Sequence, residues 1–213
     1  MSNIPYLIII DKQTGKRETS FPEVPPDTKE SLYQMATELY PEHLHLYDKT
    51  GEIQNQLINQ DSYWLNGKVE KRPSHLYDWD GSKWVLNEQK QAELLFSQKS
   101  RIWESIKEYR YNRSLGGVYI KSVDRWFQTG EEEKTKYLGL SQVIDKIGSI
   151  EWKTFENDFV EMTPDLLAEI FAEMVRAENA DHINAERHKA AMMQSDKPLD
   201  YDFSTGWERR YED

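Results

Sequence analysis

Cysteine is absent from all 213 positions of the sequence. Its absence excludes disulfide bonds, thiol nucleophiles and thiolate metal ligands in one step. A chain without disulfides is suited to a reducing compartment, so we expect synthesis in a cytoplasm. At this length the chain can bury the core of one large domain or of two small ones.

Long apolar runs and positive charge are also scarce. The apolar stretch Tyr6–Ile10 ends at Asp11 and follows no basic segment, so it predicts neither a signal peptide nor a membrane span. The 27 Lys and Arg residues are outnumbered by 38 Asp and Glu residues, which gives a formal net charge of -11. Nucleic acids and anionic membranes attract clustered basic side chains, so we expect neither as a partner.

Signatures of common enzymes are missing as well, since the sequence has no Gly-rich phosphate loop, no Gly-x-Ser-x-Gly and no His-Glu-x-x-His. His43 and His45 share a strand face, but no third ligand is near them, and zinc sites need three protein ligands. Glu178, His182 and Glu186 have helical spacing and are interpreted as a solvated stripe, or as an oligomer contact between copies of the helix. We expect no catalytic residue, metal or cofactor.

The first part of the chain carries the patterns of short strands. Residues 6–10 predict a buried strand, and residues 29–39 predict one amphipathic helix with Asp27 or Thr28 as its cap. Turn signals that contain glycine lie at residues 48–51, 66–67 and 80–81. They predict a run of short antiparallel strands, and hence a β-rich domain with one helix over residues 1–86.

The second part alternates helices with hairpins. Asn87 is a plausible cap for a long helix to residue 115, which ends where Gly116-Gly117 permits left-handed backbone. Hairpins are expected at residues 118–129 and 150–162, and helices over residues 131–147 and from Thr163-Pro164 onward. The apolar positions expected in these elements include Tyr137, Leu138, Val143, Ile144, Ile147, Ile150, Trp152, Phe159, Val160 and Val175.

Together these patterns predict an α+β protein in four parts. The parts are a β-rich N-terminal domain (1–86), a bridging helix (87–115), a compact helix and hairpin domain (116–195) and an aromatic C-terminal tail (196–213). Four aromatic residues in so short a tail are unusual for a disordered segment. We therefore expect the tail to become ordered on a partner or on the rest of the protein.

The segment Tyr77–Leu86, YDWDGSKWVL, mixes two carboxylates with aromatic residues. Asp78 and Asp80 alternate along one strand and point the same way, whereas a glycosidase needs two carboxylates facing each other across the substrate. An Asx-type turn at Asp80-Gly81 explains the acids without catalysis. Trp79 and Trp84 flank the turn, where they can pack across the hairpin or contact a partner.

Several short motifs between residues 100 and 193 occur in a fixed order. They are Arg110 and Arg113 before Gly116-Gly117-Val118, Trp126-Phe127, Trp152-Lys153 followed by Asn157, Met162-Thr163, and the region His182–Lys189. This order resembles a small domain of unknown function found at the C-terminus of tailed-bacteriophage tail-fibre-assembly and tail proteins. Two turns depart from that pattern: Gly130 follows Thr129 where an aspartate is usual, and Val123-Asp124-Arg125 replaces a turn with glycine. The segment around Trp79 is also similar to short motifs of phage fibre-assembly chaperones.

The resemblance implies a phage tail context and no chemistry. We expect a non-enzymatic protein that binds a tail fibre or another tail protein, as an assembly chaperone or fibre-associated factor, with homo-oligomers as an option. Alternatives are a permanent virion tail or baseplate subunit and, from a different class, a carbohydrate- or host-surface-binding module that uses the Trp79/Trp84 hairpin. The expected location is the cytoplasm of the infected bacterial host during assembly, or the virion tail. Candidate contact residues are Trp79, Trp84, Tyr201, Phe203, Trp207 and Tyr211, because aromatic side chains dominate protein interfaces.

Overall fold

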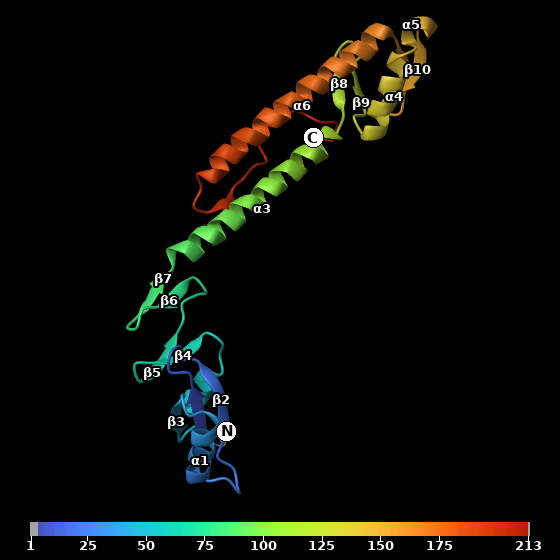
Figure 1. The fold of residues 1–213 in the computed structure, drawn as a ribbon. Coiled ribbons are helices and arrows are strands. Elements are labelled where there is room, and N and C mark those ends of the chain that lie inside the picture. Colours follow the sequence, from blue (N-terminus) through green and yellow to red (C-terminus); the bar gives the residue numbers. More distant parts are fainter. Residues whose placement is uncertain (1–3, 213) are drawn as a thin grey trace. The chain divides into compact units, whose positions relative to one another are not determined.

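The computed structural model describes residues 4–212 and shows an α+β protein (Figure 1). Residues 1–3 and 213, the ends of the first and last predicted parts, lie outside the described residues. The chain divides into two compact units, one ending at Gln91 and the other beginning at Ala92. This boundary falls inside the long helix that the sequence predicts from residue 87.

The first unit is built around a three-stranded antiparallel sheet in the order β2-β1-β3. The strands are β1 (Tyr6–Ile10), β2 (Arg17–Pro22) and β3 (Leu44–Asp48). The central strand is buried on both faces, because Leu7 and Ile9 pack with helix α1 (Lys29–Leu39) while Ile8 and Ile10 pack with Leu57. The predicted helix is confirmed, and Thr28 and Ser31 form a capping box at its start.

One of the three predicted hairpin turns in this unit is wrong. Residues 48–51 do not return the chain along β3; Gly51 instead begins the short helix α2 (Glu52–Leu57). The side chain of Asp48 accepts hydrogen bonds from the backbone N–H groups of Thr50 and Gln54, at 3.1 and 2.9 Å, and so supports this start. The partner of β3 is β1, which is distant in sequence.

The other two turns do join hairpins. Strands β4 (Ser62–Leu65) and β5 (Lys68–Lys71) are joined by Asn66-Gly67, with φ of 51° and 76°. Positive φ at both positions is the two-residue turn that Asn-Gly predicts. Strands β6 (Tyr77–Trp79) and β7 (Trp84–Leu86) are joined by a longer loop, in which the Asp80 carboxylate accepts hydrogen bonds from the N–H groups of Ser82 and Lys83.

The second unit contains most of α3 (Glu88–Ser114) and all of α6 (Pro164–Met193). The two helices lie side by side and run antiparallel (Figure 1), because Lys99 donates to the carbonyl of Met193 while Arg110 contacts His182. Both predicted starts are confirmed: Asn87 accepts a hydrogen bond from the Lys90 N–H, and Thr163 accepts one from Leu166.

Two hairpins pack at one end of this helix pair. They are β8 (Val118–Ile120) with β9 (Arg125–Phe127), and β10 (Ile150–Lys153) with β11 (Phe159–Met162), both as predicted. Their inward side chains meet one face of α6 in a single core that includes Ile120, Phe127, Tyr137 and Ile170.

The helix predicted over residues 131–147 is broken. It forms α4 (Glu131–Ser141) and α5 (Ile144–Ile147), with Val143 at φ -129° between them. Because the helix is interrupted, its predicted apolar residues do not share one buried face. Tyr137 and Ile144 are buried, whereas Leu138, Val143 and Ile147 are exposed. Expected apolar positions that are exposed in the structure are Leu138, Val143, Ile147, Ile150, Phe159 and Val175.

After α6 the chain turns back through a short 3-10 helix, η1 (Pro198–Asp200), and runs along the helix pair (Figure 1). We call residues 201–212 the C-terminal strap. The predicted aromatic tail thus lies on its own unit, and it is held there by both side-chain and backbone contacts. One backbone contact is the 3.0 Å hydrogen bond from the Tyr211 N–H to the carbonyl of Gly116.

Candidate functional site

The two tryptophans of the β6–β7 hairpin form a directly opposed pair. Their ring centroids are 5.4 Å apart at an interplanar angle of 68°. Tyr63 packs edge-on against Trp84 at 5.1 Å, and both indoles are half-buried. Trp84 therefore packs between two rings of its own unit, and Trp79 lies at the edge of that cluster.

The carboxylates beside these tryptophans have structural partners. Asp78 binds Lys90 and Asn87, and those hydrogen bonds lower its pKa. Hydrogen bonds from the backbone of Lys83 and Ser82 lower the pKa of Asp80 in the same way. A general acid that works near neutral pH needs a raised pKa, so neither carboxyl group is prepared for proton donation.

Three of the four aromatic residues of the C-terminal strap contact the helices α3 and α6, and the fourth contacts the turn between β10 and β11. Trp207 lies 5.2 Å from the ring of Tyr109 and stacks on His188 at 5.7 Å. Tyr201 contacts His188, Phe203 contacts Tyr109, and Tyr211 stacks on Phe155. These four strap residues are half-buried or partly exposed, and their rings hold the strap on the unit.

A buried ion pair fixes the end of the strap. Arg210 on the strap binds Asp181 on α6, and their side chains are only 5% and 1% exposed. Asp181 also accepts a 3.0 Å hydrogen bond from the Glu208 N–H, and Arg113 donates to the Glu208 carbonyl. Residues 208–210 are therefore held in place, although they stand near the end of the chain.

The β8–β9 hairpin contributes a second wall. Tyr119 and Trp126 are opposite one another in the strand register, with ring centroids 5.5 Å apart. The backbone N–H of Trp126 donates to the carboxylate of Glu156, and the backbone carbonyl of Trp126 accepts from the Phe155 N–H. These two bonds join the hairpin to the β10–β11 turn. Trp126 is buried while Tyr119 remains 41% exposed.

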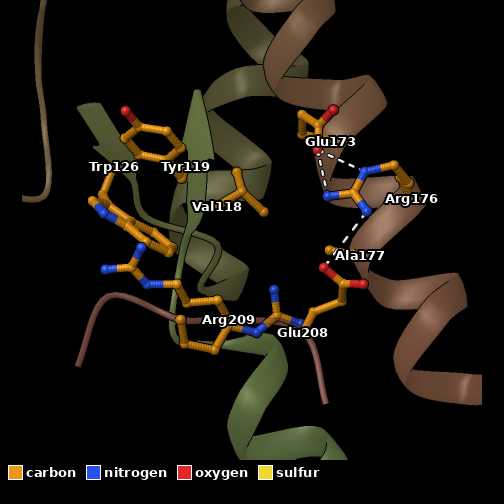
Figure 2. Close-up of a pocket in the computed structure, with 9 residues that line it drawn as sticks. Val118, Tyr119, Trp126, Glu173, Arg176, Ala177, Glu208 and Arg209 are labelled. Atoms are coloured by element: carbon orange, nitrogen blue, oxygen red, sulfur yellow. Dashed lines mark hydrogen bonds and ion pairs between the residues drawn. The ribbon is translucent and has the colours of Figure 1, made fainter. Parts of the chain in front are cut away.

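The strap, the hairpin and α6 enclose a cavity of about 190 Å³, which is our candidate site (Figure 2). Its lining residues are Val118, Tyr119 and Trp126 from the hairpin, Glu173, Arg176 and Ala177 from α6, and Glu208, Arg209 and Arg210 from the strap. Figure 2 shows the Trp126 ring and Arg209 on one side and Arg176 with its two glutamates on the other.

The charges around the cavity are distributed unevenly. Arg176 binds Glu173 at 2.8 Å and Glu208 at 3.5 Å, so one cation engages both glutamates. Both carboxylates raise the pKa of Arg176, and the hydrogen bond to Glu173 has the larger effect. Arg209 lies over the Trp126 ring with its guanidinium carbon 5.8 Å from the centroid, and it forms no ion pair with any carboxylate in residues 4–212.

The histidines and glutamates that form patterns in the sequence contact other residues in the structure. Glu178 binds Lys134 at 2.7 Å, and His182 contacts Arg110 at 3.0 Å. His45 contacts the carbonyl of Tyr40. Within residues 4–212 there is no group of three His, Cys, Asp or Glu side chains able to hold a metal ion, and no helix long and apolar enough to cross a membrane.

Sequence reasoning did not identify this cavity. It noted Trp126 as part of a family motif and chose the aromatic residues of the strap, but not the charged residues between them. Arg209 and Trp126 are 83 positions apart, and no local pattern relates them. The nearest signal is the pair Arg209-Arg210, in a tail whose only other basic residue is Lys197.

Comparison with known proteins identifies a family through a match within the second unit. A model described as Domain of unknown function (DUF4376) matches residues 97–205, just over half of the sequence. No curated protein and no solved structure matches the chain. The matched range includes the β8–β9 hairpin and α6 but ends before Glu208, so the cavity combines the family domain with a wall that lies beyond the match.

Proposed function

This chain belongs to the family of the Domain of unknown function (DUF4376), and we propose that it is a non-enzymatic bacteriophage tail protein that binds tail fibres. The phage context comes from the resemblance of its motifs to the C-terminal domain of tail-fibre-assembly and tail proteins. The protein acts as an assembly chaperone or as a factor that stays associated with the fibre.

The observation that carries the proposal of binding is the surface around the cavity, where Tyr119, Trp126 and Arg209 lie together. Tyrosine, tryptophan and arginine are the residues most enriched at interface hot spots, because they bury a large area and still offer hydrogen bonds. The buried pair of Asp181 and Arg210 anchors the strap at the residue next to Arg209, and an anchored surface loses less entropy on binding.

The mechanism is contact without chemistry. By covering an apolar patch on a fibre chain, the protein keeps fibre chains from aggregating before they trimerise. Its net charge of -11 keeps such a complex soluble. If the protein remains bound after assembly, it becomes a tail component, and mass spectrometry of purified particles separates the two roles: a chaperone that is released is absent from the particles.

Co-expression with a tail-fibre protein, followed by pull-down, tests the proposal. We expect a stoichiometric complex with the unmodified chain and a complex weakened by about 1 to 2 kcal/mol for Tyr119→Ala, the cost of truncating one interface aromatic. Tyr111→Ala is the matched control, since Tyr111 is an exposed tyrosine of the same unit, outside the cavity.

A carbohydrate- or host-surface-binding role is the competing proposal from a different class. Binding of glycans by the isolated protein, abolished by Trp79→Ala or Trp84→Ala, would contradict fibre binding as the main function. Absence of any fibre complex in the pull-down would contradict it as well.

A further inference from the structure

The charged lining of the cavity between the hairpin, α6 and the strap consists of three arginines and two glutamates. Both glutamates in its wall, Glu173 and Glu208, are already engaged by Arg176. The guanidinium of Arg210 points to Asp181 and to the carbonyl of Gly117. An incoming group therefore meets cationic N–H donors, and a ligand that itself brings a cation finds both wall carboxylates occupied.

Arg209 is the donor best placed to receive a ligand. It is exposed and forms no ion pair within residues 4–212, and the Trp126 ring lies beneath it at 5.8 Å. An aromatic face beneath a guanidinium leaves the N–H groups along its edge available. Those N–H groups match two oxygens in one plane, which is the geometry of a carboxylate.

The size of the cavity limits the ligand. Its volume is about 190 Å³, whereas cofactor and drug-sized sites usually measure about 300 to 1,000 Å³. A carboxylate on a short aliphatic stem fits this space, and the stem would lie on the buried side chains of Val118, Trp126 and Ala177.

The overall charge also selects among anions. At a net charge of -11 a polyanion is repelled along its whole length. Charges beyond about 8 Å are screened at physiological salt, so a single carboxylate responds mainly to the cavity lining, where three arginines outnumber the two glutamates.

From these observations we propose that the cavity is a carboxylate-recognition site, and that its occupant is an aspartate or glutamate side chain on the surface of the protein partner. This inference rests on the proposed function, since it names the chemistry by which the second unit selects that partner. Arg209 forms the bidentate contact, Trp126 supports it, and the strap must be in place for either to act.

The test uses the full-length protein and a small probe, N-acetylglutamate N-methylamide, followed through the indole N–H signal of Trp126 in NMR spectra. We expect a saturable shift of that signal. The neutral isostere N-acetylglutamine N-methylamide and the variant Arg209→Gln should each weaken binding at least about tenfold, the loss expected for one bidentate charged contact. Arg187→Gln, an exposed arginine of α6 outside this cavity, should leave the affinity unchanged.

Equal binding of the glutamate and glutamine probes overturns the inference, as does tighter binding of methyl phosphate than of the glutamate probe. A second variant, Arg209→Lys, guards against a disturbance of the strap by Arg209→Gln, because lysine keeps the charge but lacks the two parallel N–H donors of arginine. We expect this variant to bind the glutamate probe with intermediate affinity. An affinity equal to that of the unmodified chain overturns the bidentate contact. A fibre complex that forms equally well with Arg209→Gln overturns this inference alone and leaves fibre binding intact.

Discussion

Neutralising one member of the buried pair between Asp181 and Arg210 is expected to destabilise the second unit strongly. The two side chains are 1% and 5% exposed, so Asp181→Asn or Arg210→Gln leaves a single charge in a site closed to water. Removing one partner from such a pair costs about 3 to 5 kcal/mol.

Each substitution acts through the charge left behind. Asparagine keeps an oxygen that can accept the hydrogen bond from the Glu208 N–H, so Asp181→Asn tests the charge more than the shape. The double variant removes both charges, and we expect it to be less destabilised than the sum of the single variants by about 1 to 3 kcal/mol.

Urea unfolding followed by tryptophan fluorescence measures the effect, with the two units fitted as separate transitions. For a unit of this size a loss of 3 kcal/mol corresponds to a midpoint lower by about 1 to 3 M urea. Glu173→Gln is the control, because the Arg176–Glu173 pair is 58% and 33% exposed, and such a pair contributes about 0 to 1 kcal/mol.

Limited proteolysis then shows where the unit opens. Cleavage should appear first within the strap in both single variants, because the pair is what joins Arg210 to α6. Single variants that lose less than about 1 kcal/mol, or a double variant that equals their sum, would refute the reasoning that this pair is desolvated and coupled.

Two further predictions concern the backbone and acid. Gly206→Ala should lower the free energy of unfolding in urea by about 1 to 2 kcal/mol, since φ is +78° and the added carbon would meet the Asn184 side chain at 2.7 Å. Gly139→Ala is the control in α4, where an added carbon meets nothing within 4 Å. It should raise the free energy of unfolding by about 0.5 to 1 kcal/mol. Hydrogen bonds from Thr154 and Arg125 lower the pKa of Asp158 below its ordinary value of 3.8. The folding stability that the ionised carboxylate contributes is therefore present above pH 3.8, and it is lost as the pH falls through the lower pKa of the folded state. Asp158→Asn should therefore flatten the loss of stability measured between pH 4 and pH 2; an unchanged slope would contradict this.

The sequence predicts those elements of the fold that depend on local chemistry. Asn66-Gly67 defines its hairpin because both residues accept positive φ. Thr28, Asn87 and Thr163 begin helices because their side chains bind the free N–H groups of the first turn. Each of these signals operates within four residues.

Elements that depend on distant contacts are predicted less well. Gly51 carries a turn signal, yet the neighbouring strand β1 supplies the pairing of β3, and the freed segment becomes α2. Periodicity extends one helix through Val143, although that region contributes only Tyr137 and Ile144 as buried residues, with Leu140 partly buried against the same core.

The candidate site is the least predictable part, because three separate segments form it. The aromatic residues of the strap indicate contact, but their composition alone does not say whether the surface beneath belongs to a partner or to the same chain. The structure places that surface on α3 and α6, through Trp207 and the Arg210–Asp181 pair. Of the two charged residues between them, Glu208 and Arg209, only Arg209 is exposed.

Native mass spectrometry of the protein co-expressed with a tail-fibre protein tests the proposed function most directly. We predict a complex of defined stoichiometry, reduced by Tyr119→Ala and by Arg209→Gln and unaffected by Tyr111→Ala. Two separate species, with no complex at any concentration at which both proteins are soluble, would contradict the proposal that this chain binds tail fibres.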